Sequence, residues 1–99
     1  MVTYIVKRLE EFSDWLKGLK DGLTRQRLNK RLRKVQLGNL GVEPVGESVY
    51  EMREHFGPGW RMYYVQRGNA LIVMLGGGEK STQQADTNRA IELAKSLED

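Results

Sequence analysis

Residues 49–75 read VYEMREHFGPGWRMYYVQRGNALIVML, and this stretch decides the fold. The sequence Gly57-Pro58-Gly59 is a strong turn signal between two segments rich in aromatic and β-branched residues, so we predict a hairpin of strands at 49–56 and 60–67. A second turn at Gly68-Asn69 leads into a third strand at 70–75. This third strand is apolar throughout, which indicates that it is covered on both faces of an antiparallel meander.

The flanking segments predict helices and additional strands. Apolar residues recur at helical spacing over residues 9–19 and 24–37, with Thr24 as the expected N-cap of the second helix, and the short connection favours an antiparallel helical hairpin. A C-terminal helix is expected to begin near Ser81, where Gln84 completes a capping-box pattern. Residues 2–6 have the composition of a strand that can join the sheet, and a short strand is expected around Val45.

Length and composition restrict the class of protein. A chain of 99 residues forms one domain, which we place at residues 1–99. Cysteine is absent and His55 has no companion ligand, so we expect no metal site and no cofactor. No apolar run approaches the roughly 20 residues that span a bilayer, and the N-terminus lacks the layout of a secretory signal. We therefore expect a cytoplasmic protein with no membrane role.

Positive charge gathers in and just before the second predicted helix. The net charge is +3, yet the segment 17–34 contains many cations and Asp21 as its acidic residue. The cations are Lys17, Lys20, Arg25, Arg27, Lys30, Arg31, Arg33 and Lys34. A solvated surface is one interpretation, but this imbalance favours binding to a polyanion or to an acidic partner.

A run of three glycines follows the meander, where residues 76–83 read GGGEKSTQ. Glycine lets the backbone approach a ligand closely, and a helix N-terminus attracts anions, so we predict a loop in which Lys80 binds phosphate. This segment is not a nucleotide-binding P-loop. That motif requires glycine immediately before the lysine and again five positions earlier, where this chain has Glu79 and Met74.

Two arginines of the predicted hairpin can converge on an anion. If residues 57–59 form the whole loop, His55 lies opposite Arg61, and Arg53 lies opposite Tyr63, whereas a two-residue loop would separate the arginines. The second turn would place Arg61 opposite Gly76, at the mouth of the glycine loop. Opposed cations disfavour a sheet, so we expect an anion to neutralise them.

Other interpretations of these residues stay open. Arg53 can pair with Glu51 or Glu54 on an exposed strand, as most surface ion pairs do without a functional role. His55 alone can be an ordinary surface residue. Tyr63 lies on the arginine face and is the better candidate for stacking on an RNA base, whereas Trp60 and Tyr64 are expected in the core.

Six short motifs, in chain order, resemble those of a known family. They are FSDWLKGL (12–19), GNLG (38–41), PVG (44–46), VYEMR (49–53), GPGWRMY (57–63) and GGGEKSTQ (76–83). Together they resemble the phage-derived addiction-module killer proteins, which belong to the wider RelE/ParE toxin superfamily. The resemblance covers residues 9–97.

The resemblance implies an α+β fold in which an N-terminal helical hairpin and a C-terminal helix pack around a curved antiparallel β-sheet. It implies a bacterial toxin that is held in check by a small cognate antitoxin of the helix-turn-helix type. Many RelE-like toxins enter the ribosomal A site and cut mRNA, so the ribosome and mRNA are expected partners. ParE-like members act on DNA gyrase, which makes a non-enzymatic gyrase-binding toxin the alternative, and an inactive antitoxin-binding protein is a third possibility.

The resemblance also assigns roles to individual residues. Arg53 and Arg61 match the basic strand positions that contact the scissile phosphate, and Lys80 follows the last core strand as a further cation. Several RelE-like toxins use a C-terminal tyrosine or histidine as acid or base, and this chain has neither after Tyr64. Lys80 or His55 is therefore expected to transfer protons. The expected RNA-binding residues are Tyr63, Lys30, Arg31, Lys34, Ser81 and Gln83.

Overall fold

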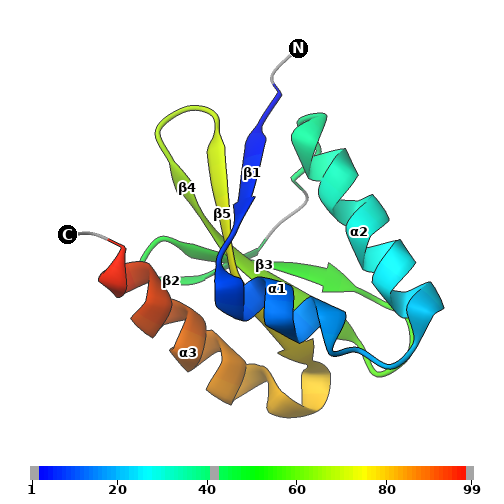
Figure 1. Cartoon of the computed structure of the whole chain (residues 1–99). Coiled ribbons are helices and arrows are strands. Elements are labelled where there is room, and N and C mark those ends of the chain that lie inside the picture. The colour runs from blue at the N-terminus through cyan, green and yellow to red at the C-terminus, as the bar shows by residue number, and fades with distance from the viewer. Residues whose placement is uncertain (1–2, 41–42, 98–99) are drawn as a thin grey trace.

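The structure is a computed structural model, and it describes residues 3–40 and 43–97. Its elements in chain order are β1 (Ile5–Arg8), α1 (Glu10–Lys17), α2 (Gly22–Gln36), β2 (Glu43–Gly46), β3 (Val49–Glu54), β4 (Trp60–Arg67), β5 (Leu71–Glu79), a 3-10 turn η1 (Lys80–Thr82) and α3 (Gln83–Ser96). Figure 1 shows the helices arranged around a strongly twisted sheet. The predicted α+β fold, with two N-terminal helices and a C-terminal helix packed around the sheet, is confirmed.

The five strands form one sheet in the order β1-β5-β4-β3-β2. The predicted meander of β3, β4 and β5 is antiparallel, and the short strand around Val45 lies at one edge as β2. β1 occupies the other edge, where it pairs with β5 in the parallel direction, so the sheet is mixed. A parallel neighbour needs a long crossover, which the intervening helices and meander supply. Val2, where the first strand was expected to begin, lies outside the described residues.

The predicted register of the hairpin is wrong by two residues. Arg53 lies opposite Arg61, and Glu54 lies opposite Trp60, so His55 belongs to the loop and does not face Arg61. The loop is longer than the three-residue turn because the amide of Gly59 donates to the carbonyl of Phe56 at 3.1 Å, which keeps Phe56 out of the ladder. Gly59 turns the chain with a φ of 81°, a conformation that favours glycine.

The predicted register between β4 and β5 is also wrong. Arg67 pairs with Leu71 rather than Ala70, because Gly68, with a φ of 64°, starts a longer turn. A β-bulge beside Tyr63 then shifts the register by one more residue. Arg61 consequently lies opposite Gly78 and not Gly76.

The three glycines belong to β5 rather than to a loop, which corrects the prediction of a phosphate-binding glycine loop. A Cβ atom on Gly77 would lie 2.4 Å from the ring of Trp15, and one on Gly78 would lie 1.8 Å from Oδ2 of Asp86. The glycines therefore let side chains from α1 and α3 pack directly against the two faces of the strand.

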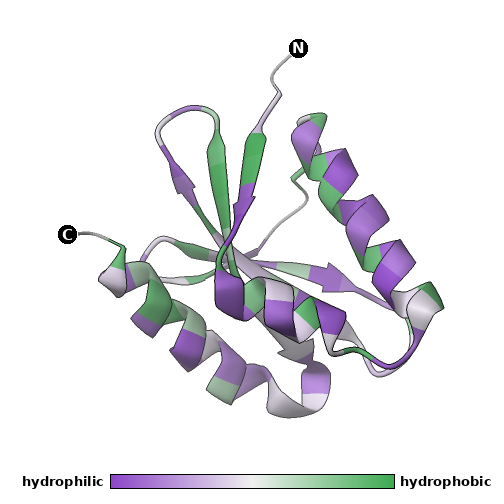
Figure 2. Ribbon diagram, in the orientation of Figure 1, coloured by the Kyte–Doolittle hydropathy of each residue, from purple (hydrophilic) through white to green (hydrophobic). Residues whose placement is uncertain are grey.

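Helices cover both faces of the sheet, and each face has its own core. On one face, Phe12 and Leu16 of α1 and the apolar side of α2 pack against alternate residues of the strands. On the other face, Ala90 and Ala94 of α3 pack against the remaining alternate residues, with Tyr63 fully buried. Figure 2 shows α2 as largely hydrophilic, with hydrophobic residues confined to one stripe of the helix.

Two predicted helix caps differ from the structure. Asp21, not Thr24, is the N-cap of α2, because its carboxylate accepts hydrogen bonds from the Leu23 amide at 3.2 Å and the Thr24 hydroxyl at 2.8 Å. These hydrogen bonds lower the pKa of the Asp21 carboxyl, and the bond from Thr24 contributes more than the bond from Leu23. The capping box expected at Ser81 is absent from η1 and α3, since the Ser81 hydroxyl donates to Glu79 at 3.0 Å.

Within residues 3–40 and 43–97, the helices are too short or too polar to cross a bilayer.

Candidate functional site

Two arginines face each other on the sheet surface that α3 partly covers. Arg53 of β3 and Arg61 of β4 are cross-strand partners. On the same face, Glu51 lies two residues before Arg53 in β3, and Tyr63 lies two residues after Arg61 in β4. Opposed like charges destabilise a sheet by up to about 1 kcal/mol unless an anion lies between them. The site therefore requires a counter-charge.

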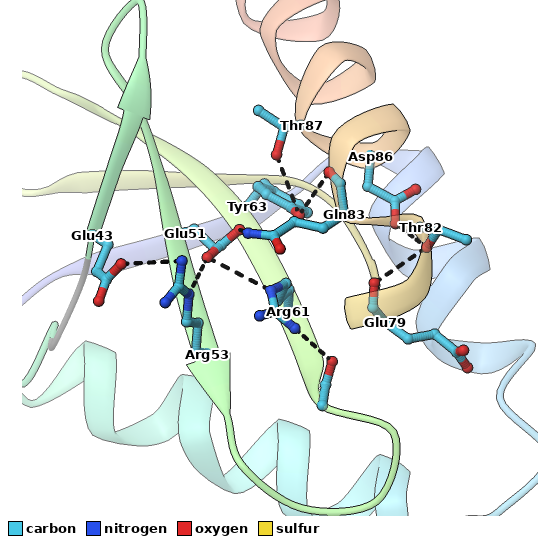
Figure 3. A network of polar contacts seen from close by, with 11 residues as sticks. Glu43, Glu51, Arg53, Arg61, Tyr63, Glu79, Thr82, Gln83, Asp86 and Thr87 are labelled. Atoms are coloured by element: carbon cyan, nitrogen blue, oxygen red, sulfur yellow. Dashed lines mark hydrogen bonds and ion pairs between the residues drawn. The ribbon is translucent and has the colours of Figure 1, made fainter.

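The counter-charge is Glu51, a fully buried carboxylate that the sequence suggested only as one alternative partner of Arg53. Oε1 of Glu51 lies 2.5 Å from Nε of Arg53 and 3.7 Å from Nε of Arg61. Figure 3 shows the three side chains pointing toward one another. Glu54, the next residue of the strand, points to the opposite face of the sheet, where it lies 3.7 Å from Nε of Arg31. The anion that neutralises the two arginines is thus Glu51, two residues before Arg53 on the same face of β3, and not an external ligand as expected.

The two guanidinium groups differ in access to solvent. The side chain of Arg61 is 9% exposed, and its Nη1 donates to the carbonyl of Gly59 at 3.0 Å. Its Nε has no hydrogen-bond partner among the described residues. The side chain of Arg53 is 35% exposed and also lies 3.2 Å from Glu43, and the hydrogen bond to Glu51 raises its pKa. Arg53 can thus meet a ligand from solvent, while Arg61 is largely enclosed and its Nε faces Glu51.

Residues at the start of α3 extend this network on the face of the sheet that α3 covers. Nε2 of Gln83 donates to Oε2 of Glu51 at 3.1 Å, so Gln83 fixes the second carboxylate oxygen. The hydroxyl of Tyr63 lies 3.5 Å from both the Gln83 carbonyl and the Thr87 hydroxyl. Burial raises the pKa of Tyr63 to about 12. Because Tyr63 is fully buried, it offers no ring face for a stacked base, which corrects its assignment to RNA binding.

The backbone of Lys80 lies next to Arg61, while His55 lies in the β3–β4 loop. The carbonyl of Gly59 accepts hydrogen bonds from the Lys80 amide at 2.9 Å and from the Arg61 guanidinium at 3.0 Å. This shared acceptor fixes the backbone of the exposed Lys80 next to Arg61. His55 is exposed in the β3–β4 loop, outside the strand register.

A cleft of about 520 Å³ separates β2 from the start of α3. Its lining residues include three of the expected site residues, Lys80, Ser81 and Gln83. Val45, Gln84 and Thr87, which sequence reasoning did not select, complete it. Gln84 and Thr87 follow Lys80 and Gln83 at helical spacing, and that periodicity was the available signal.

The basic helix α2 lies on the opposite face of the sheet from Arg53 and Arg61. Lys30 and Lys34 are exposed beside a depression of about 230 Å³. Arg31 lines the same depression, but it donates to the carbonyls of Asn39, at 2.9 Å, and Leu40. The expected RNA-binding residues are therefore divided between two faces, and Arg31 also has a structural role.

The described residues contain no cluster of three or more histidine, cysteine, aspartate or glutamate side chains placed to hold a metal ion.

The fold defines an α+β domain of the RelE type. It is similar to a double mutant of the Escherichia coli toxin RelE in the free state, with a TM-score of 0.73, 16% identity, and coverage of 92% of this chain and 97% of that chain. It is also similar to the intact E. coli RelBE toxin–antitoxin complex, with a TM-score of 0.64, 18% identity, and coverage of 77% and 95%. At these identities the likeness shows the fold alone.

The chain belongs to the family described as Phage derived protein Gp49-like (DUF891), which matches residues 14–98. An uncharacterized protein of Haemophilus influenzae is 34% identical over 97 residues, which cover 97% of this chain and 98% of that protein. The resemblance to phage-derived proteins with a RelE-like fold is thus confirmed.

Proposed function

We propose that this chain is the toxin of a toxin–antitoxin pair and that it cleaves mRNA in the ribosome. The RelE-type fold and the similarity to a toxin in complex with its antitoxin support the first part. The observation that carries the second part is the arginine pair around Glu51, with Lys80 anchored beside it. A phosphate is the ligand that two guanidinium groups and an amine recognise best.

In the proposed reaction, the ribose 2′-oxygen attacks the adjacent phosphorus while a base removes its proton. The bond from phosphorus to the 5′-oxygen breaks, and an acid protonates that oxygen. The products are a 2′,3′-cyclic phosphate and a 5′-hydroxyl. Arg53 and Arg61 stabilise the additional negative charge on the phosphoryl oxygens of the transition state. Lys80 is the proposed proton-transfer group, since it lies beside the pair, and His55 is the alternative.

Glu51 orients the two arginines for phosphate binding. A carboxylate between two arginines holds both guanidinium planes in place before substrate arrives, so little reorganisation is needed when the phosphate binds. The partly exposed guanidinium group of Arg53 supplies donors that Glu51 leaves available.

The test is inducible expression without an antitoxin, followed by primer-extension mapping of mRNA 5′ ends. We expect new ends inside translated codons for the wild type, and none for Arg61→Ala or Arg53→Ala. Arg89→Ala is the matched control, because Arg89 is an exposed arginine of α3 that pairs with Glu11. Cleavage that persists in folded Arg61→Ala and Arg53→Ala variants would refute the assignment of the site.

A gyrase-binding toxin is the second candidate, favoured by the absence of tyrosine and histidine after Tyr64. Growth arrest with intact mRNA, together with inhibition of supercoiling by the purified protein, would support it. Harmless expression of the folded wild-type chain would instead support an inactive antitoxin-binding protein.

A further inference from the structure

We propose that the cleft between β2 and the start of α3 binds a nucleobase of RNA beside the phosphate held by Arg53 and Arg61. The position next to a cut rests on the proposed function, whereas base binding itself does not. The cleft is lined by Val45, Lys80, Ser81, Gln83, Gln84 and Thr87.

The side chains of the cleft match the chemistry of a base. Lys80, Gln83, Gln84 and Thr87 are spaced so that they lie along one side of the η1–α3 segment, and Val45 faces them from β2. Amides both donate and accept hydrogen bonds, as the edges of nucleobases do, while the valine offers an apolar contact to the ring. The lining contains no carboxylate that would repel a phosphorylated ligand.

The size of the cleft also fits a nucleotide. Its volume of about 520 Å³ falls within the range of roughly 300–1,000 Å³ that is typical of small-molecule sites. The cleft is therefore large enough for a base with part of its ribose.

The cleft shares residues with the arginine site. Gln83 lines the cleft and donates to Glu51 at 3.1 Å. Lys80 also lines it, and its amide binds the Gly59 carbonyl that accepts from Arg61. A phosphate at the arginines would thus place the neighbouring nucleotide at the cleft.

Gln84 and Thr87 are the residues that would read the base. Gln83 is committed to Glu51, whereas Gln84 is exposed and donates to Asn88 on the helix surface at 3.1 Å, a contact that a ligand can replace. The Thr87 hydroxyl has a long bond of 3.5 Å to Tyr63. A base edge can offer both side chains a shorter partner.

The first experiment is an NMR titration of the ¹⁵N-labelled protein with each of the four nucleoside 3′-monophosphates and with inorganic phosphate. We expect base-dependent shifts of the amides of Ser81, Gln84 and Thr87, which phosphate alone does not produce. Gln84→Ala should weaken binding of the preferred nucleotide by about tenfold. Gln36→Ala removes an exposed amide from the end of α2 and should leave binding unchanged. Equal shifts with inorganic phosphate, or unchanged binding by Gln84→Ala, would overturn the inference.

The second experiment compares the bases flanking the mapped cut sites for the wild type and Gln84→Ala. A changed base preference with retained cleavage supports the cleft as the reader. If the wild type does not cut RNA but binds nucleotides through residues 81–87, the proposed function is refuted and base binding by the cleft is supported. If both proteins cut with the same base preference and neither shows base-dependent amide shifts, base binding by the cleft is refuted and the proposed function is supported.

Discussion

Arg53 and Arg61 are direct cross-strand partners, and the Nε atoms of both lie within 3.7 Å of the same oxygen of the buried Glu51. A sheet tolerates this pair of cations because the strand that provides one of them also provides the neutralising anion. Glu51 therefore stabilises the arginine pair, and it reduces the negative charge that an external anion would need to contribute.

Replacing Glu51 with Gln is expected to lower the free energy of unfolding by about 3 kcal/mol, because it leaves the buried Arg61 without a charged partner. Urea denaturation measures this change. Glu54→Gln is the matched control on the same strand, since Glu54 is partly exposed and lies 3.7 Å from Arg31, and its effect should stay below about 1 kcal/mol. Equal effects of the two substitutions would show that Glu51 does not neutralise the arginine pair.

The stability of the protein is expected to fall as the pH rises from about 10 to 12. Burial raises the pKa of Tyr63 to about 12, while an unfolded tyrosine titrates near pH 10. Between these values the unfolded chain binds fewer protons than the folded chain, so the free energy of unfolding decreases by about 1 kcal/mol per pH unit for this group.

Tyr63→Phe removes this term. The variant should therefore lose stability less steeply than the wild type above pH 10, in urea titrations performed at a series of pH values. Tyr64 has a pKa raised to about 12 as well, so the variant should retain part of the slope. An identical slope in both proteins would mean that Tyr63 is not buried as the structure describes.

Gly77→Ala is expected to destabilise the protein by about 1–3 kcal/mol, because the added methyl group would lie 2.4 Å from the ring of Trp15. Gly76→Ala is the matched control in the same strand, since a Cβ there meets nothing within 4 Å. Thermal unfolding of the two variants measures the difference. Tolerance of alanine at Gly77 would contradict the packing of α1 against β5.

The sequence was sufficient for the elements of the fold and insufficient for their register. Alternation and turn residues identify β3, β4 and β5 because they are local signals. The register depends on the Phe56–Gly59 hydrogen bond and on the bulge beside Tyr63, which are properties of the folded backbone. A shift of two residues decides whether Arg61 faces Arg53 or His55.

The glycine run shows a second limit of sequence reasoning. Glycine permits close approach of any group, and the sequence does not specify whether that group is a phosphate or a side chain. Trp15 and Asp86, the groups that approach, come from helices distant in the chain. Arg53, Arg61 and Lys80 were nevertheless identified as neighbours, since charged residues at strand ends stand out locally, whereas the buried Glu51 resembled an ordinary strand residue.

The cations of α2 are expected to separate into two functional groups when each is replaced with alanine. Lys30 and Lys34 are exposed, so their loss should weaken binding to ribosomes a few-fold and reduce its salt dependence, without changing stability. Arg31 holds the carbonyls of Asn39 and Leu40, so its loss should lower the free energy of unfolding by about 1–3 kcal/mol. Ribosome co-sedimentation at several salt concentrations, beside urea denaturation, measures both quantities. Lys17→Ala is the control, because Lys17 is exposed on α1. If Lys17→Ala weakened binding as much as Lys30→Ala, the contact would reflect net charge rather than a surface on α2.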